Sequence, residues 1–151
     1  MVPPELEPLV IDFEGFHRVV RRRPEITAVP YICPAGFWTR GYGELCRQDA
    51  GEITEPQARQ RLREVLLPFY TAEALRLSPR LLLEPSRRLA AIADFVFNLG
   101  AGRYSASTLR RKVNAEDWTG AGVEIRRWVF AGPVKLPGLV LRREVEAGLL
   151  G

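Results

Sequence analysis

Three side chains in the first third of the chain could carry acid, base or nucleophilic chemistry: Glu14, Cys33 and Thr39. Glu14 lies at the end of an apolar pattern that predicts a helix, and Gly15 directly after it is a typical helix stop. The negative end of a helix and any apolar cover both favour the protonated form of a carboxyl group. Such a group can serve as a general acid, although most helix-terminal Glu residues simply lie on the surface.

Cys33 and Thr39 belong to the stretch Pro30–Cys46, which predicts a compact β-hairpin or small sheet. Its β-branched and aromatic residues suit a pleated surface. Pro34-Ala35-Gly36 is typical of one turn, and Gly41-Tyr42-Gly43 of a second tight turn or of a close approach to something bound. The cysteine has two interpretations, a reactive thiolate or the small buried apolar residue that a free cysteine usually is.

Helices are predicted on both sides of this stretch. Apolar residues at three- and four-residue spacing predict a helix from Glu5 to about Phe16. Thr54-Glu55-Pro56-Gln57 is a capping box, which starts a helix that runs to about Leu77. Pro68 should kink or divide that helix.

The second half of the chain is predicted to be helical throughout. The expected helices are Ser86–Leu99, Ser105–Val113, Trp118 to about Phe130, and Pro137–Leu150. The first of these is apolar on nearly every side, which places it in the core, and Gly100 and Gly102 should terminate it. Helices and strands are segregated along the chain, so the fold class is α+β, mainly helical.

Composition limits the function classes. The chain has 151 residues and a formal net charge of +4, which indicates one soluble domain with a basic surface. Such a surface suits binding to nucleic acid, anionic lipid or a bacterial wall polymer, or is merely solvated. A charged loop is expected at His17–Val29 around Arg21-Arg22-Arg23, and it too is expected to be solvated. One histidine and two cysteines exclude a multi-histidine metal site and a disulfide framework, so no metal is expected.

Several motifs occur in an order that resembles the bacteriophage-type lysozymes (endolysins of glycoside hydrolase family 24) over nearly the whole chain. Phe13-Glu14-Gly15-Phe16 is similar to the family's catalytic Glu at a helix end. The hairpin motif is matched by Tyr31, Cys33, Thr39 and Gly41-Tyr42-Gly43. The C-terminal half resembles the family at Phe95–Gly102, Ser107-Thr108-Leu109, Trp128, Leu136–Val140 and Arg142-Arg143-Glu144.

The resemblance implies a lysozyme-like, two-lobed fold in a single catalytic domain, 1–151. Its parts are a β-hairpin lobe at about 17–53, a connecting helix at about 55–77 and a helical lobe at about 78–151. It also implies a muramidase, which hydrolyses the β-1,4 bond between N-acetylmuramic acid and N-acetylglucosamine in peptidoglycan and so lyses the cell wall.

The resemblance further implies a role for individual residues. Glu14 is the general acid, Cys33 occupies a second catalytic position that holds Asp or Cys, and Thr39 helps to position the attacking water. Three residues match substrate-binding positions: Leu45, Phe97 and Thr108. For Phe97, plain core packing is an equally good explanation.

The sequence departs from the family in two places. Glu14 and Cys33 are separated by 18 residues, more than is usual, and the insertion falls at Arg21–Pro24. It leaves Glu25 as an alternative second carboxylate. Glu44 stands where a histidine often follows the Gly-Tyr-Gly turn, and a disulfide between Cys33 and Cys46 is possible, although reduced cysteines are favoured because a disulfide would disable a catalytic thiol.

Two other functions stay open at this level. One is a catalytically impaired wall-binding relative that keeps the fold, and the other is a nucleic-acid binder, for which no recognition-helix motif is visible. The partner that the resemblance implies is bacterial peptidoglycan, for a muramidase that needs no cofactor. We expect no nucleic acid, no membrane span and a monomeric protein. No secretory signal is recognisable, so the expected location is the host cytoplasm before holin-type release to the wall.

Overall fold

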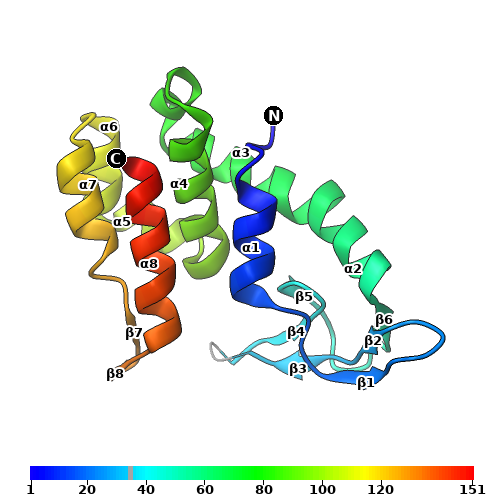
Figure 1. Cartoon of the computed structure of the whole chain (residues 1–151). Helices are drawn as coiled ribbons and strands as arrows, with labels where there is room; N and C mark the ends of the chain where they lie inside the picture. The colour runs from blue at the N-terminus through cyan, green and yellow to red at the C-terminus, as the bar shows by residue number, and fades with distance from the viewer. Residues whose placement is uncertain (34–35) are drawn as a thin grey trace. The chain divides into compact units, whose positions relative to one another are not determined.

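The computed structural model describes residues 1–33 and 36–151 (Figure 1). They form two compact units: Glu7–Leu66, and Met1–Leu6 together with Leu67–Gly151. The first unit contains two small antiparallel sheets, and the second is almost entirely helical. The predicted class, α+β and mainly helical, is confirmed. The turn residues Pro34 and Ala35 lie outside the described residues.

The first helix, α1 (Leu6–Glu14), ends at its predicted stop. Gly15 has a φ of +65°, and its N–H donates to the Ile11 carbonyl at 3.1 Å. A Cβ at Gly15 would lie 3.3 Å from the His17 ring. Glycine is therefore favoured here for two reasons, the left-handed backbone conformation and the close approach of this ring.

Two three-stranded antiparallel sheets follow (Figure 1). One has the order β1-β2-β6, and the other the order β3-β4-β5, which is the predicted hairpin region. Their strands are β1 (Val19–Arg21), β2 (Thr27–Ala28), β6 (Ile53–Thr54), β3 (Tyr31–Ile32), β4 (Trp38–Arg40) and β5 (Glu44–Leu45).

The prediction of a loop over residues 17–29 is wrong in part, because β1 and β2 pair there with each other. The strand β6 then extends their sheet, with Thr27 opposite Thr54. The arginine run gives no strand signal, and each of the two strands is only two or three residues long. Their stability comes from the pairing of β2 with β6, more than 20 residues away in the chain.

The helical span predicted at 55–77 consists of α2 (Glu55–Arg61), a π-helical segment η1 (Leu62–Leu66) and α3 (Leu67–Leu77). The capping box is confirmed: Thr54 Oγ1 accepts from the Gln57 N–H at 3.2 Å, and Gln57 Oε1 accepts from the Thr54 N–H at 3.0 Å. Pro68 has no N–H to donate and its ring crowds the preceding turn. The regular ladder is interrupted immediately before it, as predicted.

The helical unit is built around α4 (Ser86–Leu99), whose predicted bounds are confirmed and whose side chains from Leu89 to Val96 are buried. The remaining elements are η2 (Pro79–Leu83), α5 (Ala101–Ala106), α6 (Thr108–Asn114), α7 (Trp118–Ile125), β7 (Phe130–Ala131), β8 (Val134–Lys135) and α8 (Pro137–Leu150). Among them α8 packs on both α4 and α7.

Two helix predictions in this unit are wrong. The helix expected at Ser105–Val113 is divided at Ser107, which adopts an extended conformation and caps α6 by accepting from the Arg110 N–H at 3.0 Å. Gly102 therefore lies inside α5 and terminates nothing. The helix expected to reach Phe130 ends at Ile125, because a short hairpin, β7–β8, turns at Gly132 with a φ of +59°.

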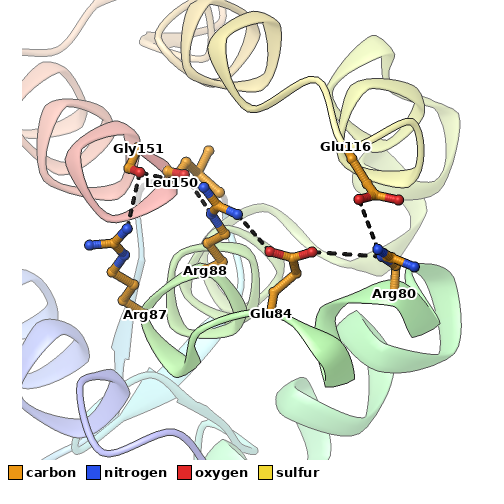
Figure 2. Close-up of polar contacts among 7 residues, drawn as sticks. All are labelled: Arg80, Glu84, Arg87, Arg88, Glu116, Leu150 and Gly151. Atoms are coloured by element: carbon orange, nitrogen blue, oxygen red, sulfur yellow. Dashed lines mark hydrogen bonds and ion pairs between the residues drawn. The ribbon is translucent and has the colours of Figure 1, made fainter.

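Arg88, on α4, makes contacts with α8 and with Glu84 (Figure 2), and also with α7. Its Nε donates to the Leu150 carbonyl of α8 at 2.8 Å, and its Nη1 donates to Glu84 at 2.6 Å. Its guanidinium stacks over the Trp118 ring of α7, 4.1 Å from the centroid. The last carbonyls of a helix lack hydrogen-bond donors within the helix, and Arg88 supplies a donor to one of them in α8.

A cluster of charged side chains is fully buried between α4 and α8. Arg142 donates from Nε and Nη2 to the two carboxylate oxygens of Asp94, at 2.8 and 2.7 Å. Arg143 donates to Asn98 at 2.8 Å, and its Nε lies 2.9 Å from Glu146. Burying charges is costly unless they are paired, so this cluster strongly restricts how the two helices pack.

Candidate active site

Glu14 is the last residue of α1 and is half-buried. The chain then turns at Gly15 and brings the His17 ring back over that glycine. From His17 it continues into β1 and β2, and so reaches β3 without passing through another helix.

Five side chains share one face of the β3-β4-β5 sheet. Thr39 stands opposite Tyr31 on one side and opposite Leu45 on the other. The Cys33 N–H donates to the Phe37 carbonyl at 3.0 Å, which extends the same register toward the turn. Because strand side chains alternate between faces, these residues lie together on what is called here the Thr39 face: Tyr31, Cys33, Phe37, Thr39 and Leu45.

The Thr39 face is buried at its centre and exposed at its rim. Thr39 is 4% exposed, and its Oγ1 donates to the Phe37 carbonyl at 3.1 Å, which leaves the oxygen lone pairs as acceptors. Phe37 and Leu45 are 60% and 64% exposed. The fold therefore brings together, on one face, three of the site residues predicted from the sequence: Cys33, Thr39 and Leu45.

Tyr31 connects this face with the end of α1, and the sequence did not single it out as a site residue. Burial raises the pKa of Tyr31, and the negative charges of Glu14 and Cys33 raise that pKa further. Both groups therefore lie within electrostatic reach of the Tyr31 hydroxyl. The only signal available in the sequence was its position as the aromatic residue two places before Cys33.

The turn at Gly41-Tyr42-Gly43 has a structural explanation. Gly41 has a φ of +57°, and a Cβ there would lie 2.9 Å from the Ala58 Cβ of α2. Tyr42 is buried, and its hydroxyl donates to Glu55 Oε1 at 2.9 Å, so burial and this hydrogen bond raise the pKa of Tyr42 to about 12. The motif thus ties the sheet to the first turn of α2.

Neither Glu44, which follows the Gly-Tyr-Gly turn, nor Glu25, the alternative second carboxylate, belongs to the Thr39 face. Glu44 pairs with Arg40 across the ladder, on the opposite face, and accepts from Arg61 Nε at 2.8 Å. Arg40 also lies 3.5 Å from Glu44. Glu25 is exposed in the connection between β1 and β2. Glu44 is therefore held by two arginines as a structural ion pair.

Neither Cys33 nor Cys46 forms a disulfide. The Cys46 N–H donates to the Trp38 carbonyl at 3.0 Å, so Cys46 belongs with Trp38 on the face opposite the Thr39 face, whereas Cys33 lies on the Thr39 face. Burial raises the pKa of the Cys46 thiol. The sheet register separates the two sulfurs, in agreement with the expectation of reduced cysteines.

The other two predicted substrate residues lie in the helical unit. Phe97 is half-buried on α4, with its ring 4.8 Å from that of Tyr70. Thr108 begins α6, and its Oγ1 accepts from Arg111 at 2.6 Å. Thr108 also lines a pocket of about 430 Å³ that includes Arg103, Arg127 and Trp128.

The described residues contain neither a metal-binding cluster nor a membrane-spanning helix. Across residues 1–33 and 36–151, no three His, Cys, Asp or Glu side chains are grouped so that they could hold a metal ion. Within the same ranges, no helix has the length and apolar character needed to cross a membrane.

Comparison with known sequences gives a consistent result. The family model described as phage lysozyme matches residues 13–146. An endolysin of Acyrthosiphon pisum secondary endosymbiont phage 1 is 33% identical over 136 residues, covering 87% of this chain and 91% of that protein. A SAR-endolysin of Bacteriophage PS34 is 40% identical over 120 residues, covering 78% of this chain and 70% of that protein.

Solved structures agree with the sequence relatives. The muramidase domain of SpmX from Asticaccaulis excentricus has a TM-score of 0.77 at 25% identity, covering 99% of this chain and 97% of that chain. The active form of the P1 phage endolysin Lyz shares the fold, with a TM-score of 0.74 at 21% identity and coverage of 99% and 85%. With its Glu at the end of α1, its β-hairpin, its helical unit and a family match over 134 of 151 residues, the chain belongs to the phage lysozyme family.

Proposed function

We propose that this protein is a muramidase that hydrolyses the β-1,4 bond between N-acetylmuramic acid and N-acetylglucosamine in bacterial peptidoglycan, with Glu14 as its general acid. The family match over residues 13–146 supports the glycoside hydrolase activity. The observation that carries the assignment of Glu14 is its place at the end of α1, three residues before His17, whose ring packs against Tyr31 of the same face as Cys33 and Thr39.

Each proposed catalytic residue has a distinct task. Glu14 transfers its proton to the glycosidic oxygen as the bond to the sugar carbon breaks. Thr39 orients the attacking water through its oxygen lone pairs, and Cys33 in its thiolate form accepts a proton from that water. The products are two sugar chains, one with a new reducing end at muramic acid.

Substrate contacts are proposed in both units. Leu45 and Phe37 form the exposed apolar rim of the Thr39 face, which suits the apolar side of a sugar ring. Phe97 and Thr108 are proposed to contact the glycan from the helical unit. The net charge of +4 favours adsorption to an anionic wall. We also propose that the protein is a monomer and that it reaches the wall from the host cytoplasm by holin-type release.

The test compares the wild-type protein with Glu14→Gln on purified peptidoglycan, with identification of the new reducing ends. We expect muramic acid reducing ends from the wild type and a loss of about two to four orders of magnitude in kcat for the variant, the usual contribution of general acid catalysis. Asp12→Asn, which removes the same charge from an exposed position of α1, should keep full activity. Binding of peptidoglycan without cleavage by folded wild-type protein would contradict the proposal and favour the impaired wall-binding relative.

A further inference from the structure

The Tyr31 side chain joins the two elements that carry the proposed catalytic residues. It begins β3, stands directly opposite Thr39, and precedes Cys33 by two residues on the Thr39 face. Its ring packs edge-on against His17, with centroids 5.7 Å apart and an interplanar angle of 71°. Since His17 follows Glu14 by three residues, the ring is held between the hairpin and the segment that leaves α1.

The Tyr31 hydroxyl is a neutral group within electrostatic reach of two groups that can become negative. Burial raises the pKa of Tyr31 and the charges of Glu14 and Cys33 raise that pKa further, so the phenol keeps its proton near neutral pH. A neutral phenol can donate one hydrogen bond and accept another. A donor beside a carboxylate or thiolate favours the ionised form of that group.

We propose that Tyr31 is a positioning residue of this active site, whose hydroxyl stabilises the Glu14 carboxylate formed when the acid gives up its proton and stabilises the ionised Cys33 thiol. This inference rests on the proposed function. The Tyr31 O–H bond itself neither breaks nor forms: the proton of Glu14 goes to the leaving oxygen, and the phenol reorients toward the new negative charge. Tyr31 thereby couples the acid on α1 to the thiol on the hairpin.

The first test is Tyr31→Phe, which removes the hydroxyl and keeps the ring against His17. We expect kcat to fall by about tenfold or more, the worth of a hydrogen bond to a charged group, with KM within about twofold of wild type. The pH profile of kcat should move to higher pH, because the Cys33 thiol loses a donor to its ionised form, while His17, the other titratable group against the ring, keeps its ring contact.

A matched control is Tyr42→Phe in the same unit. Its hydroxyl also donates to a carboxylate, that of Glu55 at 2.9 Å, but the contact ties the sheet to α2. This variant should lose stability and keep kcat and the pH profile of the wild type. Equal loss of kcat in both variants would overturn the proposal, since the effect would then follow stability.

A second readout needs no substrate. In a Cys46→Ser background, the rate of alkylation of Cys33 against pH reports ionisation of its thiol, and Tyr31→Phe should move that titration to higher pH. An unchanged titration with an unchanged kcat would overturn the proposal, as would a Tyr31→Phe protein that does not fold, because a positioning hydroxyl is dispensable to folding. A shifted titration in a wild-type protein that does not cleave peptidoglycan would support this contact and refute the proposed function alone.

Discussion

At the scale of the residue, the choice of a thiol at position 33 has chemical consequences. A carboxylate is ionised well below neutral pH, whereas an ordinary thiol ionises near pH 8.5. Only the thiolate is an effective base or nucleophile. The proposed mechanism therefore makes activity depend on the ionised fraction of Cys33, which lies half-buried on the Thr39 face.

We predict opposite results for two substitutions of Cys33. Cys33→Ser should lower kcat/KM by about a hundredfold or more, because a hydroxyl is not ionised at these pH values and the contribution of a general base is lost. Cys33→Asp should retain much of the activity and extend it to lower pH, since a carboxylate stays ionised there. The measurement is kcat/KM on purified peptidoglycan from pH 4 to 9, with NMR of the first-formed anomer.

Cys46→Ser is the control for this pair, because Cys46 lies on the opposite face of the sheet. It should leave the pH profile unchanged. A Cys33→Ser variant with full activity would show that the thiol only fills space and has no catalytic task.

The residues of the site were only partly predictable from sequence. Glu14, Cys33 and Thr39 were recognisable because their types and order carry chemical meaning. Tyr31 and Phe37 were not, because membership of the Thr39 face depends on the strand register. Gly36, with a φ of +87°, donates its N–H to the Cys33 carbonyl at 2.8 Å in this register, and a shift of one residue would have placed a different set of side chains on the face.

At the scale of the element, local signals were reliable and distant ones were not. The capping box at Thr54 and the bounds of α4 depend on residues close in sequence, and both were predicted. The strands β1 and β2 depend on pairing with β6, a partner distant in the chain, and were missed. Ser107 was missed because a serine within a helical pattern becomes visible as a cap only when its side chain accepts from the backbone.

Arg88 gives the element scale its own prediction. Its guanidinium contacts α7 through Trp118. It also contacts α8 through the Leu150 carbonyl, and Glu84 before α4 (Figure 2). We expect Arg88→Ala to lower the free energy of unfolding by about 2–3 kcal/mol, because it removes a mostly buried ion pair, a helix C-terminal hydrogen bond and a cation–π contact together. Urea unfolding followed by circular dichroism measures this difference.

The neighbouring Arg87 provides the comparison. It is exposed and donates a single hydrogen bond, to the Gly151 carbonyl at 3.0 Å. Arg87→Ala should cost less than about 1 kcal/mol, as is usual for exposed polar contacts. Equal costs for the two variants would mean that the enclosed position of Arg88 contributes nothing to the stability of the helical unit.

At the scale of the whole molecule, the arrangement of charge differs between the surface and the core. On the surface, Arg22 and Arg23 are exposed in the connection between β1 and β2, and neither makes an ion pair with any residue that the structure describes. They contribute to the positive field that would favour an anionic wall. In the core, the charges between α4 and α8 are enclosed, so they affect stability instead of association.

Glu146 is the buried group through which pH should act on stability. It is fully enclosed, and burial raises the pKa of its carboxyl well above the ordinary value; Asp94 acts in the same direction, while Arg143 and Arg142 oppose it. Arg143 Nε lies 2.9 Å from Glu146, but no hydrogen bond aligns the two groups among the described residues. Burial therefore shifts the balance of this carboxyl toward its neutral form, against the opposing charges of Arg143 and Arg142.

The sign of the pH effect follows from this raised pKa. In the unfolded chain Glu146 ionises near its ordinary pKa, whereas the folded protein keeps the proton, so stability from this group is fully present below the unfolded pKa and is lost as pH rises toward and through the folded pKa. Over that window the loss approaches about 1.4 kcal/mol per pH unit.

Glu146→Gln, which is neutral at every pH, should remove this part of the pH dependence. Wild type and variant should thus have similar free energies of unfolding near pH 4 and diverge in favour of the variant toward pH 8, as measured by urea unfolding at each pH. A variant less stable by about 3–5 kcal/mol at neutral pH would instead mean that Glu146 is ionised and paired with Arg143, because removing one partner of a buried ion pair has that cost.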